Sequence, residues 1–340
     1  DLERSGDLRG GNSCRRGGRC CYWRDLCYHV CVISIVIPTY NRAEILRECL
    51  EHLSRQTCAR EQFEVIVVND GGTDSTAQVV DECIANGDIE VKYFEKKNEG
   101  QGIARNFGIG KASGEIVAFI GDDILVAPTF VEEHLKMQDE HPEESAGVLG
   151  FIAWDPRLPK TPLYEFLTNG SLILGRYGGH QFAYEKLEGK NEATYDFFYT
   201  SNISLKKSLL EKFPFDTSFL KYGWEDIALG YRLVKEAGFH LFYTKEAFAH
   251  HYHPMDELAL KKRMYAIGKA AVLFDQKYPE LHKIPSGFKK MAFQILGSEL
   301  VIGVFDVLRK IPGGVFHFWY YFSFSKKYFL EGVSGKNFSG

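Results

Sequence analysis

The feature that most constrains the fold is a repeated alternation between apolar segments rich in β-branched residues and segments with helical spacing of apolar residues. The predicted strands are residues 32–41 (VISIVIPTYN), 63–70 (FEVIVVND), 89–95 (IEVKYFE) and 115–123 (EIVAFIGDD). The predicted helices between them are residues 43–56, 76–87 and 98–114. Strands that are apolar on both faces need helices on both faces, so the pattern predicts an α/β fold with a doubly wound, mostly parallel sheet.

The composition indicates a globular protein and argues against nucleic acid as a partner. Of the 340 residues, 45% are hydrophobic and 14% aromatic, which is enough for one large α/β domain plus an appendage. The formal net charge of −4, without an extended Lys/Arg run, provides no basic field for phosphate backbones. After about residue 150 the alternation loosens, and a helical C-terminal part is expected from about Met255 onward.

The cysteines are concentrated at the start of the chain. Five of the eight lie within the first 31 residues: Cys14, Cys20, Cys21, Cys27 and Cys31. They form no pair of CxxC units, which argues against a zinc site. Because periodicity begins only at Val32, we expect residues 1–31 to be a disordered leader, or translated sequence upstream of the true start. No stretch there resembles a signal peptide, so we expect a cytoplasmic protein with reduced thiols.

Polar residues stand at the carboxyl ends of three predicted strands, at Pro38–Asn41, Asn69–Asp70 and Asp122–Asp123. In a doubly wound sheet these ends meet at one edge, where ligands bind. Buried carboxylates are costly unless a cation or donor compensates them, so the Asp122–Asp123 pair needs a partner. The first turn, PTYNRAE, lacks the glycines of a dinucleotide site. The carboxylates instead suit a nucleotide diphosphate bound with Mg²⁺ or Mn²⁺.

Four motifs resemble those of one enzyme family. They are ISIVIPTYN (33–41), VVNDGGTDST (67–76), FIGDD (119–123) and GWEDIALGYRL (223–233). In this order they resemble the family 2 inverting glycosyltransferases of the glycosyltransferase A fold. The resemblance covers residues 32–255, the expected catalytic domain. It implies transfer of a sugar from a nucleotide-diphosphate donor, with a UDP-sugar expected, to a hydroxyl of a glycan or lipid-linked acceptor.

The resemblance also implies a set of donor-binding residues. They are Pro38, Thr39, Tyr40, Asp70, Asn98, Arg105 and Asp122. Asp70 would accept a hydrogen bond from the uracil ring, although Asp in this position can instead cap the next helix. Arg105 would approach the ribose or diphosphate, with a solvated helix face as the alternative. Two adjacent carboxylates after a strand can also be an ordinary turn.

The metal ligands implied by the resemblance are Asp123 and His251. The segment FAHHYHP contains three histidines, and in an extended chain His251 and His253 share one face while His250 points away. Imidazole is a common ligand for divalent transition metals. A third ligand near Asp123 would complete a clamp for the diphosphate, whereas the alternative for His251 is a satisfied surface histidine.

The acceptor side is expected around the second half of the domain. By resemblance Asp226 is the general base, Glu225 holds the acceptor, and the acceptor pocket is bordered by Thr200, Ser201, Asn202 and Trp224. The plainer explanation of the two carboxylates is stabilisation of a helix start by the macrodipole. Two rival functions are a catalytically silent sugar-nucleotide or glycan-binding module, which would not need Asp226, and a nucleotidyltransferase, which would need a glycine- and Arg/Lys-rich first loop.

The C-terminal region, residues 256–340, is expected to be helical. Residues 288–310 and 315–329 are strongly apolar with cationic edges, but Glu299 and Asp306 interrupt the first stretch, so a membrane-spanning helix is not expected. An interfacial pair of helices is the prediction, with peripheral contact to the cytoplasmic face of a membrane. A core helix packed on the catalytic domain is the alternative.

Overall fold

A computed structural model describes residues 33–169, 183–220, 223–311 and 315–336. The cysteine-rich segment 1–31 lies outside these residues. The strands are β1 (Ile33–Thr39), β2 (Phe63–Asn69), β3 (Val91–Glu95), β4 (Ile116–Ile120), β5 (Ile124–Val126), β6 (Ala146–Trp154), β7 (Glu192–Ala193), β8 (Asn202–Lys206) and β9 (His240–His251). The helices are α1 (Ala43–Leu53), α2 (Thr76–Asn86), α3 (Gln101–Ile109), α4 (Phe130–Glu140), α5 (Pro162–Asn169), α6 (Lys207–Lys212), α7 (Glu225–Ala237), α8 (Glu257–Lys277), α9 (Gly287–Leu296), α10 (Glu299–Leu308) and α11 (Val315–Val333).

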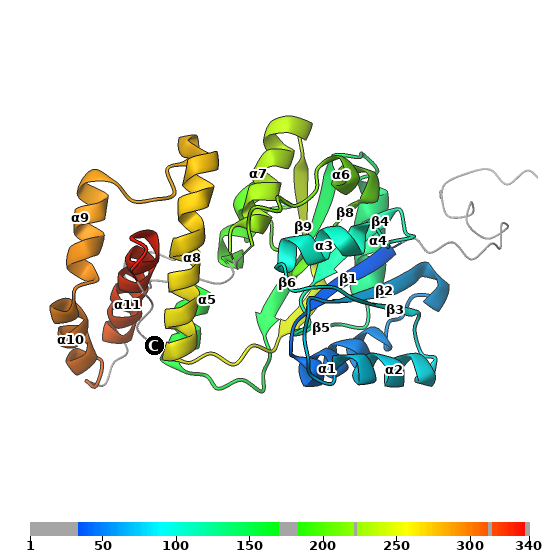
Figure 1. Ribbon diagram of the computed structural model, residues 1–340, viewed down its shortest axis with the longest axis horizontal. Helices are drawn as coiled ribbons and strands as arrows, with labels where there is room; N and C mark the ends of the chain where they lie inside the picture. The colour runs from blue at the N-terminus through cyan, green and yellow to red at the C-terminus, as the bar shows by residue number, and fades with distance from the viewer. Residues whose placement is uncertain (1–32, 170–182, 221–222, 312–314, 337–340) are drawn as a thin grey trace, which may run out of the picture.

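The strands form one mixed sheet in the order β3-β2-β1-β4-β8-β6-β9-β5, with β7 paired to β9 (Figure 1). The first four strands are parallel, β8 is antiparallel to both of its neighbours, and β5 is antiparallel to β9. The predicted mostly parallel sheet is therefore confirmed, and all four predicted strands are present. The antiparallel β8 was not predicted, because strand direction depends on the path of the chain rather than on local composition.

Helices cover both faces of the parallel half of the sheet. Helices α1 and α2 lie on one face and α3 on the other (Figure 1), as right-handed crossovers in this strand order require. Gly108 lets α3 approach β1 closely, because a Cβ at this position would lie 2.4 Å from Cγ1 of Val36. The strand ends are therefore held between two helical layers.

The C-terminal helices share a second apolar core, separate from the core of the sheet. Its buried residues come from α5, α8, α10, α11 and adjoining loops: Leu158, Leu163, Tyr164, Phe166, Leu167, Met255, Leu260, Met264, Ile302, Tyr320, Tyr321, Phe324 and Tyr328. Helices α8 and α11 cross through glycines, since a Cβ at Gly268 would lie 2.1 Å from the Phe329 carbonyl oxygen. Since α5 precedes residue 255, this core includes part of the predicted catalytic range.

The two apolar C-terminal stretches differ in their surroundings. Helix α11 lies between α8 and the outer pair α9–α10 (Figure 1), so it matches the alternative of a packed core helix. Helices α9 and α10 expose apolar side chains instead, including Phe288 and Leu300 at about four-fifths of their surface (80% and 79%). Among the described residues no single helix is long and apolar enough to cross a membrane, whereas α9 and α10, bent by 52°, together meet that criterion by length and composition.

Candidate active site

The polar ends of the first, second and fourth strands meet, as the sequence predicts. The hydroxyl of Thr39 at the end of β1 donates to Oδ2 of Asp122 after β4, at 2.8 Å. The backbone N–H of Asp70, after β2, donates to the Thr39 carbonyl at 2.9 Å. Asp122 and Asp123 are both buried, at 5% and 7% exposure. The three motifs therefore form one site at the carboxyl edge of the sheet.

The cation beside the two carboxylates is Arg42, which sequence reasoning missed. Its Nη1 lies 2.9 Å from Oδ1 of Asp122 and its Nη2 lies 2.9 Å from Oδ2 of Asp123. Burial and the adjacent Asp123 charge raise the pKa of Asp122, and Arg42 and Thr39 partly oppose this. The available signal was the arginine directly after PTYN in the first turn, because that turn lies beside the end of β4 in a doubly wound sheet.

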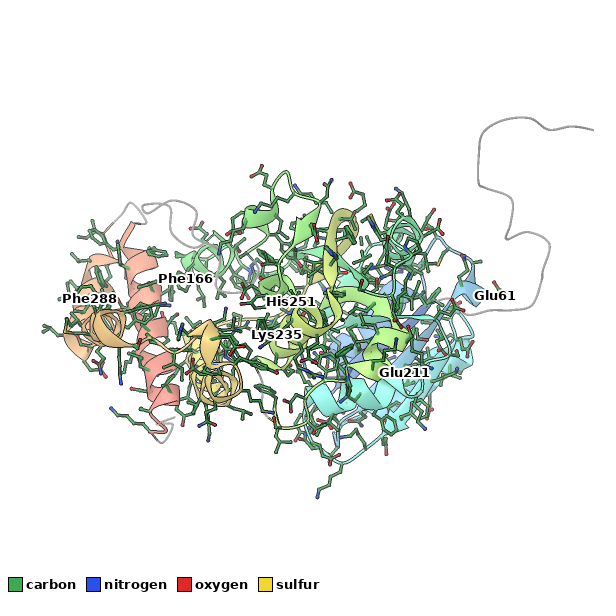
Figure 2. The ribbon with its side chains drawn as sticks, turned by 90° about the horizontal axis from the view of Figure 1, so that it is seen from above. Glu61, Phe166, Glu211, Lys235, His251 and Phe288 are labelled. Carbon is green, nitrogen blue, oxygen red and sulfur yellow. The ribbon has the colours of Figure 1, made fainter. Side chains whose placement is uncertain are left out.

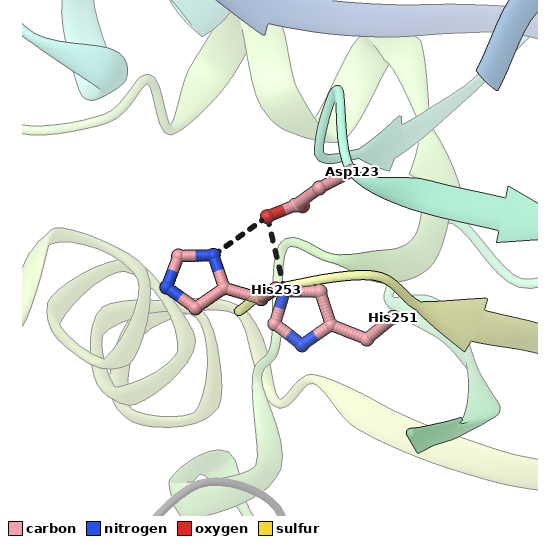
Figure 3. Close-up of side chains that lie close together, drawn as sticks. All are labelled: Asp123, His251 and His253. Carbon is pink, nitrogen blue, oxygen red and sulfur yellow. Dashed lines mark hydrogen bonds and ion pairs between the residues drawn. The ribbon is translucent and has the colours of Figure 1, made fainter. Parts of the chain in front are cut away.

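Asp123 also lies beside two histidines from the end of β9 (Figure 3). Its Oδ2 is 3.1 Å from Nε2 of His251 and 3.0 Å from Nδ1 of His253. The expectation that His251 and His253 share a face is confirmed, and His253 joins the cluster although it was not among the predicted ligands. Burial alone would raise the pKa of Asp123, but His251, His253 and Arg42 hold it well below its usual range.

These three side chains fit a divalent cation. Their ligand atoms all lie within 4.8 Å of one another. Adjacent ligands of an octahedral ion with bonds of ~2.1 Å are about 3 Å apart, close to the two Asp123–histidine distances. Burial lowers the pKa of His251 and so favours the neutral imidazole that binds metals. Two nitrogens beside one oxygen suit Mn²⁺ better than Mg²⁺, which prefers oxygen ligands.

Asp70 organises the loop before α3 and does not cap α2. Its carboxylate accepts hydrogen bonds from Lys96 Nζ (2.8 Å), the Gly100 N–H (2.8 Å) and the Glu99 N–H (3.1 Å). At the start of α2 it is Asp74 that accepts from the Thr76 N–H, at 3.2 Å. The alternative that Asp70 caps α2 is therefore wrong. Its carboxylate instead stabilises the loop between β3 and α3.

Glu225 and Asp226 begin α7, and their carboxyl groups have different surroundings. Glu225 is buried and accepts from Arg105 Nη1 (3.2 Å) and from the Gly223 N–H (3.1 Å). Asp226 is half-buried, and its Oδ1 accepts from the Ile227 N–H at 2.8 Å. Burial and the Glu225 charge raise the pKa of Asp226 to about 7, partly opposed by Arg105. A carboxyl with such a pKa has the proton affinity of a general base near neutral pH.

Comparison with known proteins decides the family. Residues 34–209 match Glycosyl transferase family 2, which is more than half of the chain. The chain belongs to this family. The membership of family 2 that the motifs predicted is therefore confirmed.

Relatives of this family 2 protein include named glycosyltransferases. It is 34% identical over 222 residues to validoxylamine A glucosyltransferase of Streptomyces hygroscopicus subsp. jinggangensis, covering 60% of this chain and 52% of the relative. It is 30% identical over 247 residues to the uncharacterized glycosyltransferase YfnE of Bacillus subtilis, covering 59% of each. The chain thus spans little more than half the length of these relatives.

The fold is shared with a solved glycosyltransferase. The mannosyltransferase PcManGT of Pyrobaculum calidifontis, solved in complex with GDP-Man and Mn²⁺, superposes with a TM-score of 0.60 at 19% identity, over 90% of this chain and 88% of that one. This likeness extends beyond the family match into the C-terminal helices, and it confirms the predicted glycosyltransferase A fold with a helical appendage.

The remaining predicted donor residues of the family 2 site differ in accessibility. Pro38 and Thr39 are buried in β1, whereas Tyr40 is half exposed and Asn98 is exposed. Arg105 is only 5% exposed and points to Glu225, so the alternative of a solvated helix face is wrong. Its partner explains the burial, because a buried guanidinium needs a carboxylate.

Two of the three predicted acceptor residues between 200 and 202 are buried. Asn202 is fully buried in β8, where its amide donates to the Ala247 carbonyl (2.8 Å) and its Oδ1 pairs with His134 Nε2 (2.9 Å). It joins strands and cannot contact an acceptor. Thr200 is also buried, and only Ser201 of this trio is partly exposed.

The two predicted acceptor-side residues at the start of α7, Trp224 and Glu225, both have partners within the protein. The Trp224 indole donates to the Ile267 carbonyl at 3.0 Å and packs on Phe274, so it attaches α8 rather than an open pocket. Both oxygens of Glu225 accept hydrogen bonds, one from Arg105 and one from the Gly223 N–H, and its role in holding the acceptor stays a prediction. The pairings of Glu225 with Arg105 and of Trp224 with Ile267 were not visible in the sequence, because these partners lie 120 and 43 residues apart along the chain.

Proposed function

We propose that this family 2 protein transfers a sugar from a nucleotide-diphosphate donor to a hydroxyl acceptor, with a divalent cation and with inversion at the anomeric carbon. The observation that carries the proposal is the cluster of Asp123, His251 and His253 beside the strand-end carboxylates (Figure 3). The Mn²⁺ complex of PcManGT, which shares the fold, supports Mn²⁺ as the ion. The glucosyltransferase name of a relative supports a hexose as the group transferred.

The donor is proposed to bind at the carboxyl edge of β1, β2 and β4. Thr39 and Tyr40 would line the nucleoside pocket, Asp70 would face the base, and Asp122 would contact the ribose. The exposed Asn98 stands next to the loop that Asp70 organises. Asp123, His251 and His253 would hold the ion, which when bound neutralises charge on the departing diphosphate.

Asp226 is proposed to act as the general base. It takes the proton of the acceptor hydroxyl while that oxygen bonds to the anomeric carbon and the bond from this carbon to the diphosphate oxygen breaks. Because attack occurs on the face opposite the leaving group, the product has inverted configuration. The raised pKa of Asp226 supports this role, since a stronger base removes the hydroxyl proton more readily.

The test separates donor binding from catalysis. Asp226→Asn keeps the size of the side chain but cannot accept the proton, so transfer should fall by about 10²–10⁴-fold while UDP affinity changes little. Asp123→Ala should instead abolish the Mn²⁺ dependence of UDP binding. Calorimetry with UDP, with and without Mn²⁺ and chelator, and product analysis over a panel of nucleotide sugars provide the measurements.

The same measurements distinguish the enzyme from the rival of a silent binding module. Such a module would bind UDP and Mn²⁺ but form no glycoside, and Asp226→Asn would then change nothing. UDP affinity that is insensitive to chelator and to Asp123→Ala would contradict the metal site. Transfer within a few-fold of the parent in folded Asp226→Asn would remove Asp226 from the mechanism.

We also propose that the protein contacts a membrane surface through α9 and α10. Helices α9 and α10 and the residues just after them expose apolar side chains, namely Phe288, Met291, Ile295, Leu300, Val304, Val307 and Ile311. Cationic Lys289, Lys290 and Lys310 flank them. Figure 2 shows Phe288 at the outer end of the helical part, away from His251. Apolar side chains rimmed by lysines suit a bilayer with anionic lipid, as a lipid-linked acceptor would require.

A further inference from the structure

Arg105 and Glu225 form a buried ion pair between the donor side and the acceptor side of the site. Both side chains are about 6% exposed, and Arg105 Nη1 lies 3.2 Å from Glu225 Oε1. Arg105 belongs to α3 and Glu225 is the first residue of α7. A buried pair of this kind is seldom a strong source of stability, since desolvation offsets most of the attraction. Its position next to Asp226 points to another role.

Other contacts hold Arg105 in place. Its Nη2 donates to Oε1 of Gln101 at 3.0 Å, and its guanidinium lies 5.6 Å from the centre of the Phe215 ring. The neighbouring Asn106 donates to the Phe215 carbonyl and accepts from the Phe215 N–H, each at 2.8 Å. The orientation of Arg105 is therefore determined by α3 and by the segment before α7.

The start of α3 is in turn tied to the donor side. Asp70 accepts from the N–H groups of Glu99 and Gly100, immediately before α3 begins at Gln101. Gly102 in the first turn of α3 packs against Glu225, since a Cβ there would lie 3.7 Å from Glu225 Cγ. A continuous set of contacts thus runs from Asp70 through α3 to the first turn of α7.

We propose that Arg105 is a positioning residue that acts through Glu225 to orient Asp226 and to balance the charge around it. The inference rests on the proposed role of Asp226 as the base. Glu225 without Arg105 would place an uncompensated negative charge next to Asp226. Arg105 without Glu225 would place an uncompensated positive charge near Asp226, which would make Asp226 a weaker base.

The charged and titratable groups around Asp226 give the direction of each effect. The Glu225 charge raises the pKa of Asp226 and Arg105 lowers it. Tyr199 is a third neighbour, and burial together with the Asp226 charge raises its pKa, so it is neutral and contributes no charge near pH 7. Removing one partner of the pair should therefore shift the Asp226 pKa one way, and removing the other should shift it the opposite way.

The test is a double-mutant cycle that neutralises each charge of the pair and measures the pH dependence of activity. A base is active when deprotonated, so activity rises with pH through its pKa. Arg105→Gln should move this acid limb to higher pH and Glu225→Gln should move it to lower pH, each by about 1 unit. The double variant should return it close to the parent position. The measurement is the pH profile of nucleotide-sugar hydrolysis with Mn²⁺, for the panel member turned over fastest.

Controls keep a folding effect apart from the proposed one. Arg105→Lys retains the charge and should leave the acid limb near its parent position even if the rate falls. If Arg105→Gln does not fold, two expectations can still be checked. The acid limb should lie at lower pH in Glu225→Gln and near its parent position in Arg105→Lys. The proposal would be overturned if Arg105→Gln and Glu225→Gln both leave the acid limb of the pH profile in place, or if both shift it in the same direction.

The failure of this inference is distinguishable from failure of the proposed function. The acid limb must disappear in Asp226→Asn if Asp226 is the base. If it disappears there but does not respond to the Arg105 and Glu225 substitutions, only the positioning role is wrong. If it persists in Asp226→Asn, the base assignment is wrong and the positioning role fails with it.

Discussion

Arg42 and the two strand-end carboxylates, Asp122 and Asp123, lie at the centre of the candidate site. Arg42 contacts the same Asp123 oxygen that His251 and His253 share. Asp123 Oδ2 thus already has a cationic neighbour, and a divalent ion bound by the three ligands would share that oxygen with the guanidinium. The two cations would repel each other, so we expect Arg42 to lower the affinity for the proposed ion.

Arg42→Met should lower the stability of the metal-free protein and raise its affinity for Mn²⁺. Without the guanidinium, Asp122 loses its cationic partner and Asp123 keeps only the two histidines, so the free energy of unfolding should fall by about 2 kcal/mol in chelator. Mn²⁺ affinity should rise several-fold because a competing cation is gone, and Mn²⁺ should recover more stability in the variant than in the parent. Calorimetry and thermal unfolding with and without Mn²⁺ measure both effects; an unchanged or weaker Mn²⁺ affinity would contradict the competition.

Among the elements, the parallel strands are joined at the end opposite the site by one buried carboxylate. Glu64 in β2 accepts from Ser34 of β1 (2.5 Å), from Ser113 before β4 (2.7 Å to its hydroxyl), and from Lys92 of β3. Burial alone would raise the pKa of Glu64, but these hydrogen bonds lower it to about 2. The alternation of apolar segments predicted these strands correctly, yet nothing in the pattern marked Glu64 as the residue that joins them.

Glu64→Gln should destabilise the protein in a pH-dependent way. A carboxyl whose folded pKa is depressed stabilises the fold above its unfolded pKa, and this contribution is lost as pH falls toward the folded pKa. The variant should be less stable by about 2 kcal/mol near pH 7, and the difference should shrink as pH falls from 4.5 toward 2. Urea unfolding at several pH values measures it. The exposed Glu61 (Figure 2) provides the control Glu61→Gln, and an equal, pH-independent loss in both variants would contradict the prediction.

For the whole molecule, the C-terminal helices divide into a packed part and an exposed part. Helix α11 packs on α8 through Gly268 and Gly332, where added Cβ atoms would lie 2.1 and 2.2 Å from carbonyl oxygens of the other helix. Helices α9 and α10 are outermost (Figure 1). Both stretches are strongly apolar with cationic edges in sequence, and only their packing distinguishes them.

The α9–α10 face should be required for membrane binding. Phe288→Glu combined with Leu300→Glu places two charges on the proposed contact, so recovery with vesicles of phosphatidylcholine and phosphatidylserine should fall several-fold in flotation. Ile84→Glu changes an exposed apolar residue (45%) on α2, outside this face, and should bind as the parent does. Equal flotation of all three proteins would contradict the proposal. So would parent protein that does not float but forms a dimer abolished by the double substitution, because the face would then bind a second copy.

The sequence by itself determined the strand and helix alternation, the family, and the meeting of Thr39, Asp70 and Asp122 at one edge, because these follow from local periodicity and from the topology it imposes. Tertiary structure alone decided which side chains became partners. Arg42 meets Asp122 across 80 residues, Glu225 meets Arg105 across 120, and His253 meets Asp123 across 130. It also placed Asn202 in the core of the sheet. Such pairings depend on strand order, strand direction and helix packing, which the residues adjacent in the chain do not specify.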